Sequence, residues 1–304
     1  IISNLRNIPG WKTKRKILVF ESDDWGTIRM PSKEVQDKLI KLGIKADQNY
    51  YNNNDSLECN NDIEGLFEVL TRYKDKNGRS AAFTPICLVA NPDFQKIRDN
   101  NFKEYFYEPV TETLNKYGSS HNKVFQLWQE GIKNKIFVPQ FHGREHLNVK
   151  RWMNCLNGDF PATKLCFDYN FFGLSDVESN EIRGEFLAAV DIDDVSENIV
   201  LAEIIKDGLN LFEKLLGYKA EYFVAPNSLM NTGLEKDLSQ MGIKFLIGSR
   251  NQPESLGNGQ YKTNFRYIGK KNEYGQTFLV RNSQFEHGQS AEQYGYEKCL
   301  KDIE

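Results

Sequence analysis

The sequence predicts a parallel α/β fold, either a barrel or an open sheet. Two observations lead to this prediction. Short apolar runs rich in Val, Ile and Phe alternate with longer segments of helical periodicity, which is the pattern of repeated strand–helix units. Polar clusters follow several of these runs, and in parallel barrels the loops that leave the carboxyl ends of the strands carry the chemistry. A chain of 304 residues is long enough for one large domain of this kind.

The N-terminal half contains three predicted strands and two predicted helices. One helix follows from the apolar spacing in 62–73, with Asp62 as its N-cap. The second helix, the strands and their bounds follow from the same patterns: strands at 16–20, 81–90 and 135–141, and a helix at 124–132.

The C-terminal half repeats the alternation. An amphipathic helix is predicted from Asn198 to Leu216, and Gly217 ends it. Three strands and a helix follow, at 222–225, 244–247, 277–280 and 234–241, and the chain closes on the start of another helix. Between 148 and 195 the pattern weakens. We interpret that stretch as an insertion within a single domain spanning 1–304.

Composition excludes several classes of protein. The net charge is −3 with no basic face, which argues against a nucleic-acid partner. No apolar stretch approaches the roughly 18 residues of a membrane span. Five cysteines without a CxxC pair argue against a disulfide framework and against a thiolate zinc site. Because the sequence starts at Ile1, we expect upstream residues to be missing. The compartment and the oligomeric state stay open.

Two of the four histidines, His142 and His146, lie four residues apart directly after a predicted strand. At that spacing two imidazoles share one face of a helix and can chelate one divalent ion. Two surface histidines on one turn are the alternative.

Asp23 and Asp24 form a second polar cluster, at the end of the first predicted strand. Adjacent acids repel each other unless a cation offsets their charge. One carboxylate can then bind a metal while the other acts as a base. A capping turn before the helix that follows Pro31 is the alternative.

The third cluster is Ala225-Pro226-Asn227, at the end of another strand. Pro226 stiffens the turn and leaves the Asn227 N–H able to point into a cleft, where it can stabilise an oxyanion. An ordinary strand-ending turn is the alternative. The three clusters together supply an Asp, two His and an oxyanion donor at one edge of a parallel sheet, which predicts a hydrolytic metal site.

The order of these motifs resembles that of the NodB-homology polysaccharide deacetylases, carbohydrate esterase family 4. The likeness runs from about Lys16 to Asn282. It implies a distorted (β/α)7 TIM-like barrel. It also implies one role for each motif residue: Asp23 as the general base, Asp24, His142 and His146 as metal ligands, and Asn227 as the oxyanion donor.

The sequence departs from the family pattern in two ways. Trp25 separates the acidic pair from Gly26, and Val224 stands where the family carries an arginine that orients the base. Arg250 and Arg281, near other predicted strand ends, are candidates to replace that arginine.

The general acid is the third question. The resemblance implies a histidine in a Leu-x-His context near the last strand, and His287 is the only histidine downstream of 277–280. Its surroundings do not match that context, and an exposed loop histidine is the alternative. We therefore hypothesise an incomplete barrel whose last, acid-bearing strand lies beyond Glu304 or is supplied elsewhere, with His287 as the alternative acid.

The predicted function is hydrolysis of N- or O-acetyl groups on a glycan, with one divalent ion, foremost Zn and otherwise Co, Ni or Mn. Two other functions compete with it. The letters His142-Gly143-Arg144-Glu145-His146 also fit the HxxEH peptidase motif, with Glu145 as base, although Gly143 disfavours the required helix. A carbohydrate-binding barrel that has lost turnover is the non-enzymatic alternative.

Overall fold

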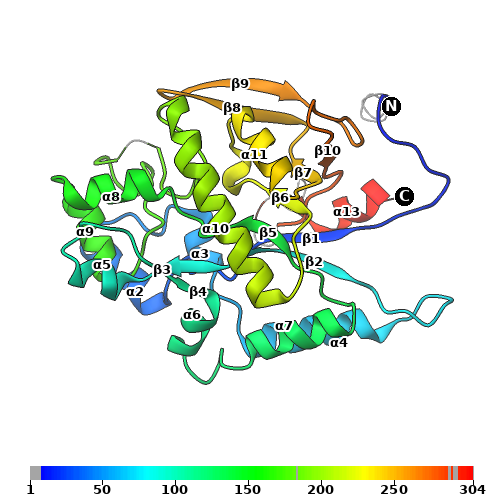
Figure 1. The fold of residues 1–304 in the computed structure, drawn as a ribbon. Coiled ribbons are helices and arrows are strands. Elements are labelled where there is room, and N and C mark those ends of the chain that lie inside the picture. The colour runs from blue at the N-terminus through cyan, green and yellow to red at the C-terminus, as the bar shows by residue number, and fades with distance from the viewer. Residues whose placement is uncertain (1–7, 183, 287–288, 290–293, 304) are drawn as a thin grey trace.

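The structure, a computed structural model, describes residues 8–182, 184–286, 289 and 294–303. Its centre is a six-stranded parallel sheet in the order β1-β2-β5-β6-β7-β10 (Figure 1). The strands are β1 Phe20–Trp25, β2 Phe83–Leu88, β5 Gln140–Gly143, β6 Tyr222–Val224, β7 Phe245–Gly248 and β10 Thr277–Val280. The predicted α/β fold is confirmed, as a curled half-barrel.

The sheet is curled enough to bring its two edge strands together at their carboxyl ends. Arg281 directly follows β10 and donates hydrogen bonds to Asp23 in β1, at the opposite edge. In the part of the chain that the structure describes, the sheet has six strands, against the seven of the barrel that the resemblance implies. A side-chain contact therefore links the edges.

Helices fill the crossovers between the parallel strands, except the one from β7 to β10, which carries a pair of strands. In chain order they are α2 Lys33–Lys41, α3 Tyr50–Asn54, α4 Asn60–Arg72, α5 Phe94–Asp99, α6 Val110–Lys116, α7 Val124–Lys133, α8 Val149–Asn157, α9 Pro161–Asp168, α10 Asn198–Leu216, α11 Glu235–Gln240 and, after β10, α13 Tyr296–Ile303. Two small antiparallel pairs, β3 Ala90–Pro92 with β4 Tyr107–Pro109 and β8 Asn251–Gly257 with β9 Gln260–Phe265, were not predicted. Among the described residues, no helix is both long and apolar enough to cross a membrane.

Two apolar clusters hold these layers together. The larger one lies between the sheet and α4, α7 and α10, with Trp128, Phe141 and Phe212 among its fully buried members. Burying a side chain of this size stabilises the fold by about 1.5–3 kcal/mol. The second cluster packs α8 and α9 against residues of the loop after β1, such as Ile28 and Met30. It anchors much of the segment 148–195; its status as an insertion in a single domain stays a prediction.

The first strand is shifted relative to its prediction. Ile17, Leu18 and Val19 are exposed and lie outside the sheet, whereas β1 runs through the acidic motif itself. The reason is the partner strand: β2 begins at Phe83, which lies opposite Phe20, so residues before Phe20 have no strand to pair with.

Two further predicted bounds were wrong for local reasons. The strand predicted at 135–141 begins only at Gln140, directly after Pro139, which has no N–H to give to a sheet. The helix predicted with Asp62 as its N-cap begins at Asn60, because the Asp62 carboxylate accepts the backbone N–H of Cys59 at 2.8 Å as a third-position capping residue.

Candidate metal centre

Asp23 and Asp24 lie in an irregular end of β1. The register of the β1–β2 pair shifts between Ser22 and Trp25, and Asp24 has a left-handed φ of 68°. A non-glycine residue in that region is strained and is tolerated where surrounding contacts hold it. The following Gly26 has φ 84°, and a Cβ there would lie 2.5 Å from the Leu88 carbonyl oxygen, so the turn requires glycine. This turn lets the two adjacent carboxylates face different partners.

The Asp24 carboxylate meets both predicted histidines. Its Oδ1 lies 3.0 Å from His142 Nε2 and 3.2 Å from His146 Nε2. One ligand atom from each residue lies within 4.8 Å of the others. Asp24, His142 and His146, far apart in sequence, are thus brought together, and this group can hold a metal ion.

The spacing of His142 and His146 had suggested that they share one face of a helix. In the structure they do not. His142 is in β5, and the four residues that follow Gly143 form a bend, with α8 starting only at Val149. The strand end and the bend deliver the two imidazoles instead, with ring centroids 5.2 Å apart.

Hydrogen bonding fixes the tautomer of His142. Its Nδ1 lies 2.8 Å from the carbonyl oxygen of Val224, which can only accept, so Nδ1 carries the proton. In the neutral ring the Nε2 lone pair then faces the Asp24 carboxylate, which is also an acceptor. Two facing acceptors need a cation or a proton between them, and Val224 has the place of the outer partner that would orient a metal-binding histidine.

The geometry fits a divalent ion. Ligands at about 2.0–2.1 Å from a tetrahedral zinc stand about 3.3 Å apart, close to the 3.0 and 3.2 Å that separate Asp24 Oδ1 from the two Nε2 atoms. A carboxylate and two imidazoles are also a donor set that zinc and its neighbours accept. His146 Nδ1 is buried without a hydrogen-bond partner among the described residues, so His146 lacks the outer partner that His142 has in Val224.

Arg29 completes the surroundings of Asp24. The guanidinium is buried and donates from Nη2 to Asp24 Oδ2 at 2.7 Å, leaving Oδ1 to the histidines. Burial alone would raise the pKa of Asp24. The two imidazoles and Arg29 outweigh it and hold that pKa well below its usual value, so the carboxylate is ionised.

The two imidazoles respond differently to burial. Burial lowers the pKa of both rings, but the contacts of His142 with Asp24 and Asp23 outweigh it and raise the pKa of His142. In His146 burial wins and the pKa falls below its ordinary value. A neutral His146 is the form that can donate a lone pair to a metal.

The neighbouring carboxylate, Asp23, pairs with Arg281. Both guanidinium Nη atoms donate to its carboxylate at 2.6 Å, while Arg281 Nε donates to Glu21 at 3.1 Å. A bidentate arginine–carboxylate pair fixes the orientation of both groups. Of the two arginines considered from the sequence, Arg281 thus stands in the position for orienting Asp23. The carboxylate itself is not a member of the metal-ligand group.

The other predicted site residues have different outcomes. Asn227 follows β6, whose Val224 carbonyl contacts His142, and has a left-handed φ of 55°. Its side-chain amide donates to Glu185, and the use of its backbone N–H as an oxyanion donor stays a prediction. His287 lies outside the described residues.

Glu145 is excluded as the base of an HxxEH peptidase. Both of its carboxylate oxygens accept from Arg144, at 2.6 and 2.8 Å, and Arg144 reaches Asp207 at 3.0 Å. The motif also lies in a bend instead of the helix that such a peptidase needs.

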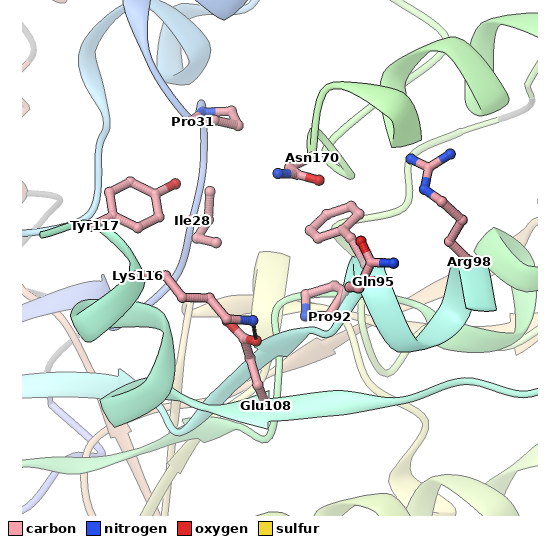
Figure 2. A pocket seen from close by; sticks show the side chains of 10 residues that line it. Ile28, Pro31, Pro92, Gln95, Arg98, Glu108, Lys116, Tyr117 and Asn170 are labelled. Atoms are coloured by element: carbon pink, nitrogen blue, oxygen red, sulfur yellow. Dashed lines mark hydrogen bonds and ion pairs between the residues drawn. The ribbon is translucent and has the colours of Figure 1, made fainter. Parts of the chain in front are cut away.

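A separate cavity of about 400 Å³ lies beside the loop that follows β1 (Figure 2). Ile28 and Pro31 form part of its wall, and the ion-paired Glu108 and Lys116 also line it. Asp24, His142 and His146 do not line it.

Sequence reasoning missed two residues of the site, Arg29 and Asp55. Arg29 contacts Asp24, and Asp55 lies 3.8 Å from Arg29 Nε. A charged residue inside the otherwise uncharged run 26–30 was the available signal for Arg29. Asp55 had none.

No protein-family pattern matches the sequence, and no curated protein matches it. Several solved structures that match over most of the chain are polysaccharide deacetylases. One from Bacillus cereus is 11% identical over 94% of this chain and 68% of its own, with a TM-score of 0.39. A de-N-acetylase from Aggregatibacter actinomycetemcomitans is 12% identical over 87% and 92%, with a TM-score of 0.36.

A third match, a 4-alpha-glucanotransferase from Thermococcus litoralis, is 11% identical and covers 76% of this chain, with a TM-score of 0.37. This chain spans only 22% of that enzyme. At such identities and TM-scores, no activity passes from these proteins to this one.

Proposed function

We propose that this protein is a metal-dependent hydrolase that removes N- or O-acetyl groups from a glycan. The observation that carries the proposal is the division of labour between two adjacent carboxylates. Asp24 converges with His142 and His146 on one point, whereas Asp23 is held apart from them by Arg281. A ligand and a separate base beside it are what hydrolysis by an activated water requires.

Asp24, His142 and His146 would hold the ion, with zinc as the first candidate and cobalt, nickel or manganese as the others. Such an ion supplies Lewis acidity, which lowers the pKa of water toward about 7 and polarises a carbonyl. Arg29 keeps Asp24 ionised and engages the oxygen that does not face the histidines. Val224 keeps the His142 Nε2 lone pair directed toward Asp24.

Asp23 takes the proton of the attacking water in this proposal. Arg281 binds both oxygens of the carboxylate and holds it in one orientation, outside the ligand group. The backbone N–H of Asn227, which follows Pro226, donates to the oxyanion that forms from the carbonyl oxygen of the acetyl group. Removal of the acetyl group then requires a proton for the leaving amine or alcohol.

The test is release of acetate. The zinc-loaded protein is incubated with N-acetylated chito-oligosaccharides and with acetylated xylan, with and without a chelator. We expect chelator-sensitive release from at least one substrate, and no release by Asp23→Asn. Binding of glycan without any release would support instead the carbohydrate-binding barrel. Release that survives full removal of metal would contradict the proposal.

A further inference from the structure

Glu21 lies two residues before Asp23 on β1, and both side chains contact Arg281. Residues two apart on a strand point to the same face of the sheet and lie about 6–7 Å apart along it. Because Asp24 and the histidines lie toward the carboxyl ends of their strands, Glu21 is the deeper of the two acids. Its side chain is 12% exposed, against 30% for Asp23. Glu21 is therefore set back from the metal ligands and from a substrate bound beside them.

Arg281 uses different nitrogens for the two acids. Nη1 and Nη2 donate to the two oxygens of Asp23, both at 2.6 Å, and Nε donates to Glu21 Oε2 at 3.1 Å. Within the part of the chain that the structure describes, these are the side-chain hydrogen bonds of Arg281. Each nitrogen of the guanidinium is thus bound, and the positive charge of the donor strengthens each bond.

The contact at Nε restrains a motion that the contacts at the other two nitrogens allow. Arg281 follows β10, which lies at the opposite edge of the sheet from β1, so no strand pairing fixes the distance from Arg281 to Asp23. An arginine side chain has many rotamers, and ordering it costs entropy. A guanidinium held only at Nη1 and Nη2 can still rock about the carboxylate that holds it. A hydrogen bond at Nε, on the other side of the planar group, restrains that rocking.

We propose that Glu21 is a positioning residue for the general base: Glu21 holds Arg281, and Arg281 holds Asp23 in the orientation in which it takes a proton from water. This inference rests on the hydrolase function proposed above. Glu21 acts only through the arginine, because among the described residues no hydrogen bond or ion pair joins it to any of the three metal ligands.

The proposed role requires an acceptor for the Nε proton of Arg281. A glutamine at position 21 has nearly the shape of glutamate, and its amide oxygen can accept the same hydrogen bond. A leucine has a similar volume and no acceptor. Glu21→Gln and Glu21→Leu therefore separate the effect of the hydrogen bond from the effect of changing the side chain at this position.

The experiment measures kcat and KM for acetate release from an N-acetylated chito-oligosaccharide, together with bound metal and melting temperature. We expect Glu21→Leu to lower kcat about tenfold, because a loosened Arg281 leaves Asp23 misplaced for much of the time. Its KM should stay within about twofold of the wild-type value, since Glu21 does not bind substrate. Glu21→Gln should retain kcat within about threefold of the wild-type value, because the neutral acceptor keeps most of the hydrogen bond. Metal content should be unchanged in both variants.

The same substitution in an Arg281→Ala background tests whether Glu21 acts through the arginine. Residues that act as one unit have non-additive effects on turnover. In that background Glu21→Leu should change kcat less than about twofold, because the side chain that Glu21 holds is absent. A full tenfold loss in the absence of Arg281 would overturn the proposed role. Glu68→Leu is the matched control, because it breaks an exposed pair with Arg72 on α4, and it should change neither kcat nor KM.

Three results would overturn the role of Glu21 and leave the hydrolase standing: wild-type kcat in Glu21→Leu, a raised KM at unchanged kcat, or a Glu21→Gln as slow as Glu21→Leu. A wild-type protein that releases no acetate would overturn the proposed function and this inference together. If Glu21→Leu does not fold, nitrogen-15 NMR of the wild type decides. The Nε–H signal of Arg281, assigned by its loss in Arg281→Lys, should exchange slowly with solvent, and rapid exchange would overturn the inference.

Discussion

Two groups of buried charges both include residues of the short segment His142–His146, and they differ in how completely their charges are paired within the protein. In the first, Arg144 meets both oxygens of Glu145 and also Asp207, and its guanidinium lies 4.4 Å from the centre of the Tyr107 ring. Each charge there has its partner inside the protein.

In the second group, Asp24 Oδ1 and the Nε2 atoms of His142 and His146 converge on one another. This group needs a metal ion or a proton between its atoms. Burial and charge are common to both groups, so neither property alone marks a functional site. The two groups differ in whether each charged or polar atom already has a partner within the protein. The number of buried acceptors without a donor is therefore a better indicator of a functional site than burial or charge.

The largest effect should come from removing a member of the convergent group. Asp24→Ala, His142→Ala and His146→Ala should each lose bound metal and all turnover, because a three-ligand site that loses one ligand no longer chelates. Asp23→Asn should retain metal and lose turnover, because Asp23 is bound to Arg281 and not to the ligands. Elemental analysis of the four purified variants checks this.

A metal-free Asp23→Asn, or an Asp24→Ala with full occupancy, would show that the roles of the two carboxylates are reversed. His121→Ala is the matched control, because His121 lies on another part of the surface and contacts the Leu57 carbonyl oxygen. It should retain both metal and activity.

Changes in the group of Arg144, Glu145 and Asp207 should lower the stability of the fold and leave metal binding unchanged. Glu145→Ala leaves Arg144 largely buried with only the half-exposed Asp207, and unpairing a buried charge costs about 3–5 kcal/mol of folding free energy. The metal content of the folded protein should stay at the wild-type level. Urea denaturation and elemental analysis measure the two quantities. Replacing both partners, as in Arg144→Met with Glu145→Leu, should recover most of the stability, since apolar pairs of similar volume often substitute for buried ion pairs.

Arg281 tests whether orientation alone matters for the base. Arg281→Ala should lower kcat about 100-fold, or about 2.7 kcal/mol, and leave metal content unchanged, because Asp23 loses its bidentate partner but no ligand moves. Arg281→Lys should lie between, since an ammonium cannot make the paired contact. Arg72→Ala, an exposed arginine on α4, is the control. Loss of metal in Arg281→Ala would assign this arginine to the ligand group.

The sequence predicted the regular elements best where they are long or strongly periodic. Asn198–Leu216 has the predicted bounds because its amphipathic spacing and Gly217 act locally. The short apolar strand Thr277–Val280 also has its predicted bounds. The hairpin of β8 and β9 was missed. Its two strands carry polar residues at most positions, so the alternation that marks a half-buried strand is weak.

The residues of the candidate site also fall into those that local sequence patterns predict and those that they do not. The motifs and their order placed Asp24 beside the two histidines, since each follows or ends a parallel strand. Arg29 and Asp55 could not be predicted, because their meeting depends on the path of the chain between β1 and β2. The choice between Arg250 and Arg281 likewise depends on how far the sheet curls, which no local pattern encodes.

The smallest effect concerns Glu58, a carboxyl that belongs to neither group and lies under the acidic turn. Its Oε2 accepts the Gly26 N–H at 3.1 Å, while Oε1 is buried without a partner among the described residues. Burial raises the pKa of Glu58 to about 7, from an ordinary value of 4.5. The folded state therefore holds a proton that the unfolded chain releases, and the stability from this group is fully present below pH 4.5 and is lost as the pH rises through 7.

Glu58→Gln removes that titration and keeps an acceptor for Gly26. Between pH 4.5 and 7 the wild type should lose about 2 kcal/mol more stability than the variant does, after allowance for partial exposure of the side chain. Urea denaturation of the metal-free protein at both pH values gives the difference, so any constant cost of burying an amide cancels. Glu64→Gln, an exposed position on α4, should leave the pH dependence of stability as it is in the wild type. If Glu58→Gln follows the wild type across this window, Glu58 is ionised in the folded protein, and the turn that carries Asp24 rests on a charged carboxylate instead of a neutral one.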